Sequence, residues 1–85
     1  MITINGLFGA NSFQPANATL KVGQTVTWRN ADSMVHNVAD YGTTFAVPDI
    51  PPGAKSRPIK MTKAGAIPYY CVLHPAMTGS LRVDP

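Results

Sequence analysis

Three residues near the end of the chain carry side chains that bind soft transition metals. Cys71, the only cysteine, is followed three residues later by His74 and three residues after that by Met77. Thiolate and thioether sulfur favour Cu(I), whereas imidazole also suits Cu(II). The chain has one further histidine, His36, which lies far upstream. These four side chains are therefore the candidate ligands of one soft metal ion.

Each of these residues also has an ordinary structural explanation. A lone cysteine is commonly a small buried hydrophobic residue, and a lone methionine commonly fills the core. A lone histidine is more often a hydrogen-bonded structural residue. Zinc binds cysteine and histidine well, but it makes little use of a thioether and would leave Met77 unexplained. The joint spacing, in a chain with one cysteine and two histidines, favours a copper site over coincidence.

The segments that contain the candidate ligands alternate between apolar and polar positions, as strands do. In "MVHNVA", His36 is in phase with Val38, and in "AIPYYC", Cys71 is in phase with Tyr69. If both apolar faces point inward, two of the ligands lie on inner faces near the ends of two strands. We therefore expect His36 and Cys71 to converge at one end of the fold.

The segment after Cys71 is expected to be a loop that folds back over this point. Pro75 stiffens it, because proline fixes its own φ and lacks a backbone donor. Such a loop brings His74 and Met77 toward the same metal. Met34, two residues before the upstream histidine, shares its strand face and is a rival sulfur ligand.

The whole chain is a series of short apolar segments between turns. These include "ITINGLF" at the start, "ATLKVGQTVTWRN", "KSRPIKMT" and "SLRV", and the chain has 8 Pro and 7 Gly. Pro58 predicts that "KSRPIKMT" is an edge strand. No segment shows a sustained helical period. The pattern predicts an all-β fold, a Greek-key β-sandwich of about seven to eight short strands, in a single domain over residues 1–85.

The composition argues against several other classes of protein. The 85 residues carry a formal net charge of +3, and no basic run is interleaved with aromatic residues, so we expect no nucleic-acid partner. No apolar stretch is long enough to span a membrane. One cysteine cannot form a disulfide within the chain. A bound metal is therefore the natural source of extra stability for so small a domain.

Three stretches resemble the cupredoxins, the type 1 blue copper proteins. "DSMVHNV" and "CVLHPAM" match the ligand pattern, and the short Cys-x-x-His-x-x-Met spacing is most similar to that of the amicyanins. "FQPANATLKVGQTVTWRN" resembles the family's Phe-x-Pro, alternating strand and Thr-Val-x-Trp. The resemblance covers about residues 13 to 83 and implies a cupredoxin-like sandwich with one copper ion.

The resemblance implies four copper ligands, which are His36, Cys71, His74 and Met77. It makes Met77 rather than Met34 the axial ligand. It also implies that Asn37 ties the ligand segments together and supports the thiolate by hydrogen bonding. Amicyanin-like loops commonly carry Thr-Pro where this chain has Val72 and Leu73. Valine has no hydroxyl, so we expect one hydrogen bond that tunes the metal to be missing.

The function implied by the resemblance is the shuttling of one electron between redox partners by Cu(I)/Cu(II) cycling. We expect electrons to pass through His74 and partners to dock on an apolar patch beside it, formed by Met34, Leu73, Pro75 and Ala76. Small interfaces suit such weak redox encounters. The alternative is a copper-binding or delivery protein without an electron-carrier role, although carriers of that kind favour exposed Met- or Cys-rich sites.

We expect the protein not to be an enzyme. Copper oxidases and nitrite reductases need further histidines, and both histidines of this chain are already used. The resemblance implies a periplasmic or otherwise extracytoplasmic location, where copper also protects the free thiol. The start of the chain is polar, so we expect a leader to be absent from it. We expect a soluble monomer.

Overall fold

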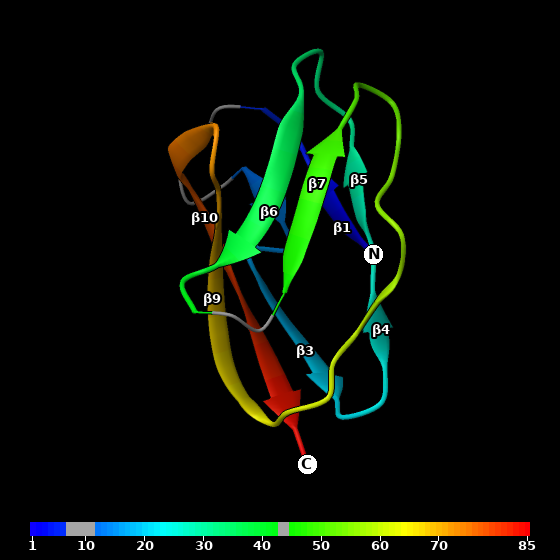
Figure 1. Cartoon of the computed structure of the whole chain (residues 1–85), viewed down its shortest axis with the longest axis vertical. Coiled ribbons are helices and arrows are strands. Elements are labelled where there is room, and N and C mark those ends of the chain that lie inside the picture. The colour runs from blue at the N-terminus through cyan, green and yellow to red at the C-terminus, as the bar shows by residue number, and fades with distance from the viewer. Residues whose placement is uncertain (7–11, 43–44) are drawn as a thin grey trace.

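The computed structural model describes residues 1–6, 12–42 and 45–85 (Figure 1). In that part of the chain the backbone forms ten strands. They are β1 (Ile2–Ile4), β2 (Phe13–Gln14), β3 (Asn17–Lys21), β4 (Thr25–Val26), β5 (Trp28–Asn30), β6 (His36–Asp40), β7 (Ala46–Ile50), β8 (Ile59–Lys60), β9 (Gly65–Cys71) and β10 (His74–Asp84). The all-β prediction is confirmed. The predicted number of strands is too low, because three of the ten are two-residue pieces.

The apolar residues Leu7 and Phe8 of the first predicted strand lie outside the described residues. β8 pairs with β4 in a two-stranded sheet, so the prediction of an edge strand next to Pro58 is confirmed. Among the described residues, no helix has the length and apolar character needed to cross a membrane.

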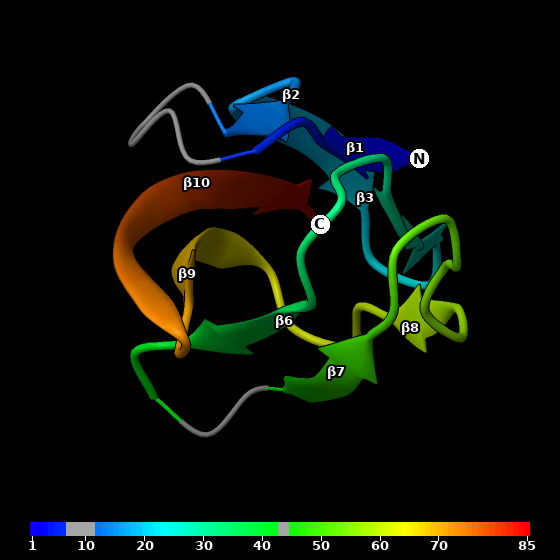
Figure 2. The ribbon, with the colours of Figure 1, turned by 90° about the horizontal axis from the view of Figure 1, so that it is seen from above.

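The strands form sheets that surround one interior, as the view from above shows (Figure 2). The largest sheet has the order β3-β10-β9-β6-β7, and the smaller ones are β2-β1-β5 and β4-β8. β1 pairs with β5 and β10 pairs with β3 in parallel, while β9 pairs antiparallel with both β10 and β6. This arrangement is the predicted Greek-key β-sandwich.

An aromatic cluster lies in the interior. Trp28, Tyr69 and Phe13 are fully buried. The ring of Tyr69 meets Phe13 edge to face with a centroid distance of 4.8 Å, and it meets Trp28 in the same way at 5.4 Å. Phe45 stacks on Trp28 at 5.3 Å. Such pairs contribute beyond the apolar area that they bury, so this cluster is a firm base for the strands that carry the site.

The hairpin of β9 and β10 packs closely over this cluster. Tyr69 lies opposite Gly79 in the antiparallel ladder. A Cβ atom added to Gly79 would lie 2.5 Å from Cζ of Tyr69. The tyrosine ring therefore lies across a position that only glycine can occupy without movement.

Candidate metal centre

The candidate ligands come from one end of the sandwich. His36 is the first residue of β6, Cys71 is the last residue of β9 and His74 is the first residue of β10. His74 pairs directly opposite Cys71, so the connection between these strands is only Val72–Leu73. The predicted ligand loop is therefore mostly strand, in a tight hairpin whose register shifts between His74 and Thr78.

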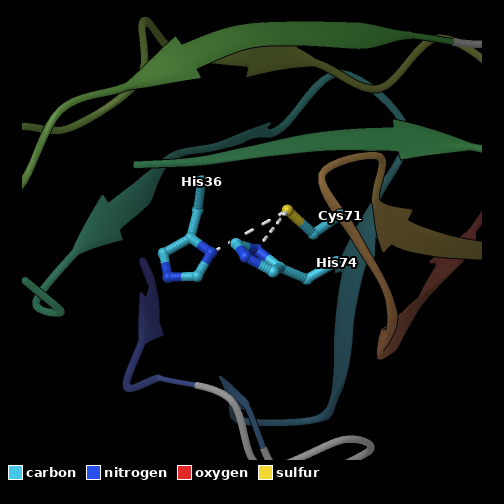
Figure 3. Close-up of side chains that lie close together, drawn as sticks. All are labelled: His36, Cys71 and His74. Atoms are coloured by element: carbon cyan, nitrogen blue, oxygen red, sulfur yellow. Dashed lines mark hydrogen bonds between the residues drawn. The ribbon is translucent and has the colours of Figure 1, made fainter. Parts of the chain in front are cut away.

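The three donor groups face one another, as Figure 3 shows. Sγ of Cys71 lies 3.8 Å from Nδ1 of His36 and 3.9 Å from Nδ1 of His74. The imidazole ring centroids are 5.1 Å apart, and one donor atom from each residue lies within 4.8 Å of the others. The predicted convergence of strands far apart in the sequence is confirmed for His36, Cys71 and His74.

The spacing of these atoms fits a single transition-metal ion. Metal–ligand bonds of about 2.0–2.3 Å at tetrahedral angles place neighbouring donor atoms about 3.5 Å apart. Sγ of Cys71 is close to that distance from each of the two Nδ1 atoms in the structure. His36 and Cys71 are buried, whereas His74 is partly exposed. The donor set thus combines a buried thiol and a buried imidazole with one imidazole that reaches the surface.

A carboxylate fixes the orientation of the buried imidazole. Nε2 of His36 lies 2.7 Å from a carboxylate oxygen of Asp32. Because a carboxylate only accepts hydrogen bonds, Nε2 carries the hydrogen and Nδ1 keeps its lone pair for a metal. The hydrogen bond with His36 lowers the pKa of the Asp32 carboxyl below its usual value. Asp32 was not among the predicted site residues, because its role depends on the imidazole that faces it in the structure.

The segment before β6 is held in shape by one buried amide. Asn30 donates from Nδ2 to the carbonyl oxygens of Met34 and Ile50 at 2.7 and 2.8 Å. Its Oδ1 accepts a hydrogen bond of 2.9 Å from the backbone N–H of Asp32. The buried side chain of Asn30 therefore links Asp32, whose carboxylate orients His36, to strand β7.

Asn37 connects the two halves of the site. Its backbone N–H points at Sγ of Cys71 with an N–S distance of 3.5 Å. Its side-chain Oδ1 accepts a hydrogen bond of 2.8 Å from the backbone N–H of Val72 and lies 3.5 Å from Sγ. The predicted role of Asn37, which joins the ligand segments and supports the thiolate, agrees with these contacts.

The two methionines have different environments. Met77 is buried in β10, three residues after His74, as part of the core. Met34 is 42% exposed, because it lies before the first residue of β6. The predicted strand face shared by Met34 and His36 is therefore wrong. Burial next to the hairpin favours Met77 as the fourth ligand, and this assignment stays a prediction.

Exposed apolar residues lie next to both histidines in the sequence. The predicted patch residues Met34, Leu73, Pro75 and Ala76 are all exposed. Val35 and Val72, which were not among the predicted patch residues, are 39% and 50% exposed. A strand start at His36 leaves Val35 outside the ladder, and the tight turn pushes Val72 outward.

The known proteins that are similar to this chain include a plastocyanin, amicyanins and a cupredoxin. No protein-family model matches it. Plastocyanin from Scenedesmus fuscus is 29% identical over 93 residues, which cover 89% of this chain and 90% of that protein. Amicyanin from Paracoccus denitrificans is 33% identical over 69 residues, and the chain spans about half of it, 53%. A solved structure, a novel purple cupredoxin from Nitrosopumilus maritimus, has a TM-score of 0.85 and 31% identity, covering 98% of this chain and 97% of that one.

Proposed function

This chain belongs to the cupredoxin family, and on that premise we propose that it binds one copper ion and carries single electrons between partner proteins. The observation that carries the proposal is the approach of Sγ of Cys71 to Nδ1 of both histidines, at 3.8 and 3.9 Å. One thiolate, two imidazoles and a weak thioether are the donor set of a blue copper site.

The residues that would hold the copper ion are His36, Cys71, His74 and Met77, with the thioether of Met77 as the weak donor. Bound copper would supply one-electron chemistry by alternating between Cu(I) and Cu(II). The protein's part is to hold the donor atoms still. Strand ends carry Cys71 and His36, and the carboxylate of Asp32 holds the His36 ring at 2.7 Å. Donors fixed in this way rearrange little when the charge of the site changes.

The electron port is proposed to be the partly exposed ring of His74. The apolar patch of Met34, Leu73, Pro75 and Ala76, extended by Val35 and Val72, would exclude water around this ring when a partner docks. A small apolar contact suits a complex that must dissociate quickly. We propose that the chain acts as a monomeric single domain in a periplasmic or other extracytoplasmic compartment.

Copper storage or delivery is the competing function. Transfer of copper to another protein requires ligands that a partner can reach, and here the thiol of Cys71 and the ring of His36 are fully buried. The sequence has two histidines, and both lie in this one group. These features favour an electron carrier over a delivery protein and over an enzyme with a second copper site.

Copper binding and its spectrum test the proposed function. Cu(II) is added to the metal-free protein, and absorption and EPR spectra are recorded. We expect an intense visible band from thiolate-to-copper charge transfer, and we expect Cys71→Ser to lose it. Met34→Leu is the matched control, because its side chain is outside the proposed ligand set. A colourless Cu(II) complex, or a Cys71→Ser variant that keeps the band, would contradict the proposal.

Zinc is the competing metal in the same experiment. A site that binds Zn(II) tightly and gives no visible band with Cu(II) would be a structural zinc site. If the band forms, electron transfer is then tested by reversible reduction and oxidation of the copper protein without loss of metal. Release of copper on each reduction would favour delivery instead.

A further inference from the structure

β6 and β7 depart from regular pairing at the residue next to the buried ligand. His36 pairs with Ile50 and Val38 pairs with Val47, so two steps along β6 face three steps along β7. Between these two pairs, Asn37 of β6 faces two residues of β7, Pro48 and Asp49, which are both exposed. A bulge of this kind turns side chains away from their regular direction, often beside a functional site. Here it puts Asp49 on the outer surface, across from Asn37.

The carboxylate of Asp49 meets the amide that supports the thiolate. Nδ2 of Asn37 donates to Oδ1 of Asp49 at 3.1 Å, while Oδ1 of Asn37 accepts from the backbone N–H of Val72 at 2.8 Å. The amide has distinct donor and acceptor ends, and a carboxylate can only accept. A flipped amide would place its NH₂ group against the N–H of Val72 and its oxygen against the carboxylate. Asp49 therefore selects one orientation of Asn37.

We propose that Asp49 is a positioning residue of the metal centre, which replaces the hydroxyl that Val72 lacks. Valine has no acceptor for the amide hydrogens of Asn37, and a strand on the other side of β6 supplies one instead. The typical net contribution of one hydrogen bond biases a two-state orientation about five-fold. The consequence for copper rests on the proposed function, whereas the orientation of Asn37 does not depend on metal.

The charge of Asp49 adds a second effect on a bound metal. A carboxylate close to the site stabilises the more positive, oxidised state, so it lowers the reduction potential. Asp49 is exposed, so added salt screens this effect. Asp49→Asn removes the charge and keeps an acceptor oxygen. Asp49→Ala removes both. The two variants therefore separate charge from hydrogen bonding.

NMR of the metal-free protein tests the positioning role. We expect the side-chain amide signals of Asn37 to move in Asp49→Ala and to stay close to their original positions in Asp49→Asn. Asp84→Asn is the matched control, because Asp84 lies at the end of β10 with Arg82 as its partner at 3.1 Å. Asn37 signals that are the same in Asp49→Ala as in the Asp84 control would overturn the proposal.

The reduction potential tests the effect on copper. We expect it to rise in both Asp49 variants, by more than in Asp84→Asn, and we expect the difference to shrink as salt is added. Equal potentials in the Asp49 and Asp84 variants would overturn the tuning role. If the protein binds no copper at all, the proposed function fails, and the NMR comparison still decides whether Asp49 positions Asn37.

A different observation points to a partner. Four exposed basic residues, here called the basic flank, lie along β5 and the segment that follows β7: Arg29, Lys55, Arg57 and Lys60. Figure 1 shows this segment running beside β5 and β4. Arg29 pairs directly opposite Lys55, and Lys60 pairs opposite Thr25. Like charges in directly opposed positions destabilise a sheet.

No ion pair joins the basic flank to an acidic residue of the described part. The chain has four aspartates and no glutamate. Each aspartate contacts a group elsewhere: Asp32 contacts His36, Asp40 contacts the N–H groups of Gly42 and Phe45, Asp49 contacts Asn37 and Asp84 contacts Arg82. Within the described residues the ion pairs are His36–Asp32 and Arg82–Asp84. The flank therefore carries an excess of positive charge that a partner can meet.

We infer that the basic flank docks an acidic protein surface. Complementary charge raises the rate of encounter and selects the partner. A membrane fits less well, because stable attachment needs a second, apolar signal, and the flank contains no large exposed apolar side chain. That the flank binds an acidic protein does not depend on the proposed function. That this protein is a redox partner does rest on it.

Poly-L-glutamate is the probe for this surface. It is titrated into isotope-labelled metal-free protein at low salt, and amide shifts are followed by NMR. We expect shifts at the basic flank and roughly ten-fold weaker binding in Arg29→Gln/Lys55→Gln/Lys60→Gln. The matched control is Lys21→Gln/Lys63→Gln/Arg82→Gln, which also removes three positive charges and so changes the net charge of +3 by the same amount.

Two results would overturn the inference about the basic flank. Equal weakening by both triple variants would mean that net charge, rather than this surface, attracts the probe. Binding to vesicles of anionic phospholipid without binding to poly-L-glutamate would assign the flank to a membrane. Neither result depends on copper, so the proposed function is tested separately.

Discussion

The fully buried hydroxyl of Tyr69 predicts a loss of stability in alkali. This hydroxyl and Nε1 of Trp28 have no hydrogen-bond partner among the described residues. Burial raises the pKa of Tyr69 from 10.0 to about 12, and the nearby indole of Trp28 opposes this rise. The neutral phenol is thus favoured in the folded protein relative to the unfolded chain.

The sign and size of the effect follow from this pKa. Well below pH 10 the phenol is protonated in both states, so pH has no effect through this group. Between about pH 10 and pH 12 the unfolded chain releases its proton and the folded protein keeps it, so the free energy of unfolding falls as pH rises. A pKa difference of about two units corresponds to a loss of up to roughly 3 kcal/mol. Above the folded pKa the loss levels off.

Urea unfolding of the metal-free protein over this pH range measures the loss. Tyr69→Phe should unfold with little dependence on pH between 10 and 12, and removal of an unsatisfied hydroxyl should cost little stability at neutral pH. Tyr70→Phe is the matched control, because the ring of Tyr70 is only partly buried and stacks on Tyr41. If Tyr69→Phe loses as much stability between pH 10 and pH 12 as the Tyr70→Phe control, burial of the Tyr69 hydroxyl is not the cause of the alkaline loss.

Three further predictions concern packing and the metal. Gly79→Ala should lower the free energy of unfolding by about 1–3 kcal/mol, because the new Cβ would lie 2.5 Å from the ring of Tyr69. Most of this cost should be absent when Gly79→Ala is made together with Tyr69→Leu. If urea unfolding shows that the costs of the two substitutions simply add, the contact is not the cause. Met77→Leu should raise the reduction potential measured by voltammetry, and Met77→Gln should lower it. A shift seen only in Met34→Leu would make Met34, rather than Met77, the weak sulfur ligand. Saturating copper should raise the melting temperature, because copper at a hundred-fold excess over its Kd adds about 3 kcal/mol to the free energy of unfolding. Equal melting temperatures of the metal-free and copper-bound forms would mean that the folded site does not bind copper more tightly than the unfolded chain.

Local sequence patterns predicted the donor types of the candidate site and the burial of His36 and Cys71. Ligand types are properties of single residues, and the short spacing from Cys71 to His74 brings a thiol and an imidazole together in one hairpin. The two-residue period of a strand is also local, so the phases of His36 with Val38 and of Cys71 with Tyr69 correctly predicted that all four are buried. The all-β class followed from the same local pattern.

The groups that support these side chains are visible only once distant segments are brought together. Asp32 and Asp49 were not recognised from the sequence, because a carboxylate acquires its role only from the group that faces it. The tight hairpin at Val72–Leu73 and the bulge at Pro48–Asp49 depend on register between strands. Register is set by contacts among segments that are distant in the chain, and a shift of one residue turns every side chain of a strand to the other face.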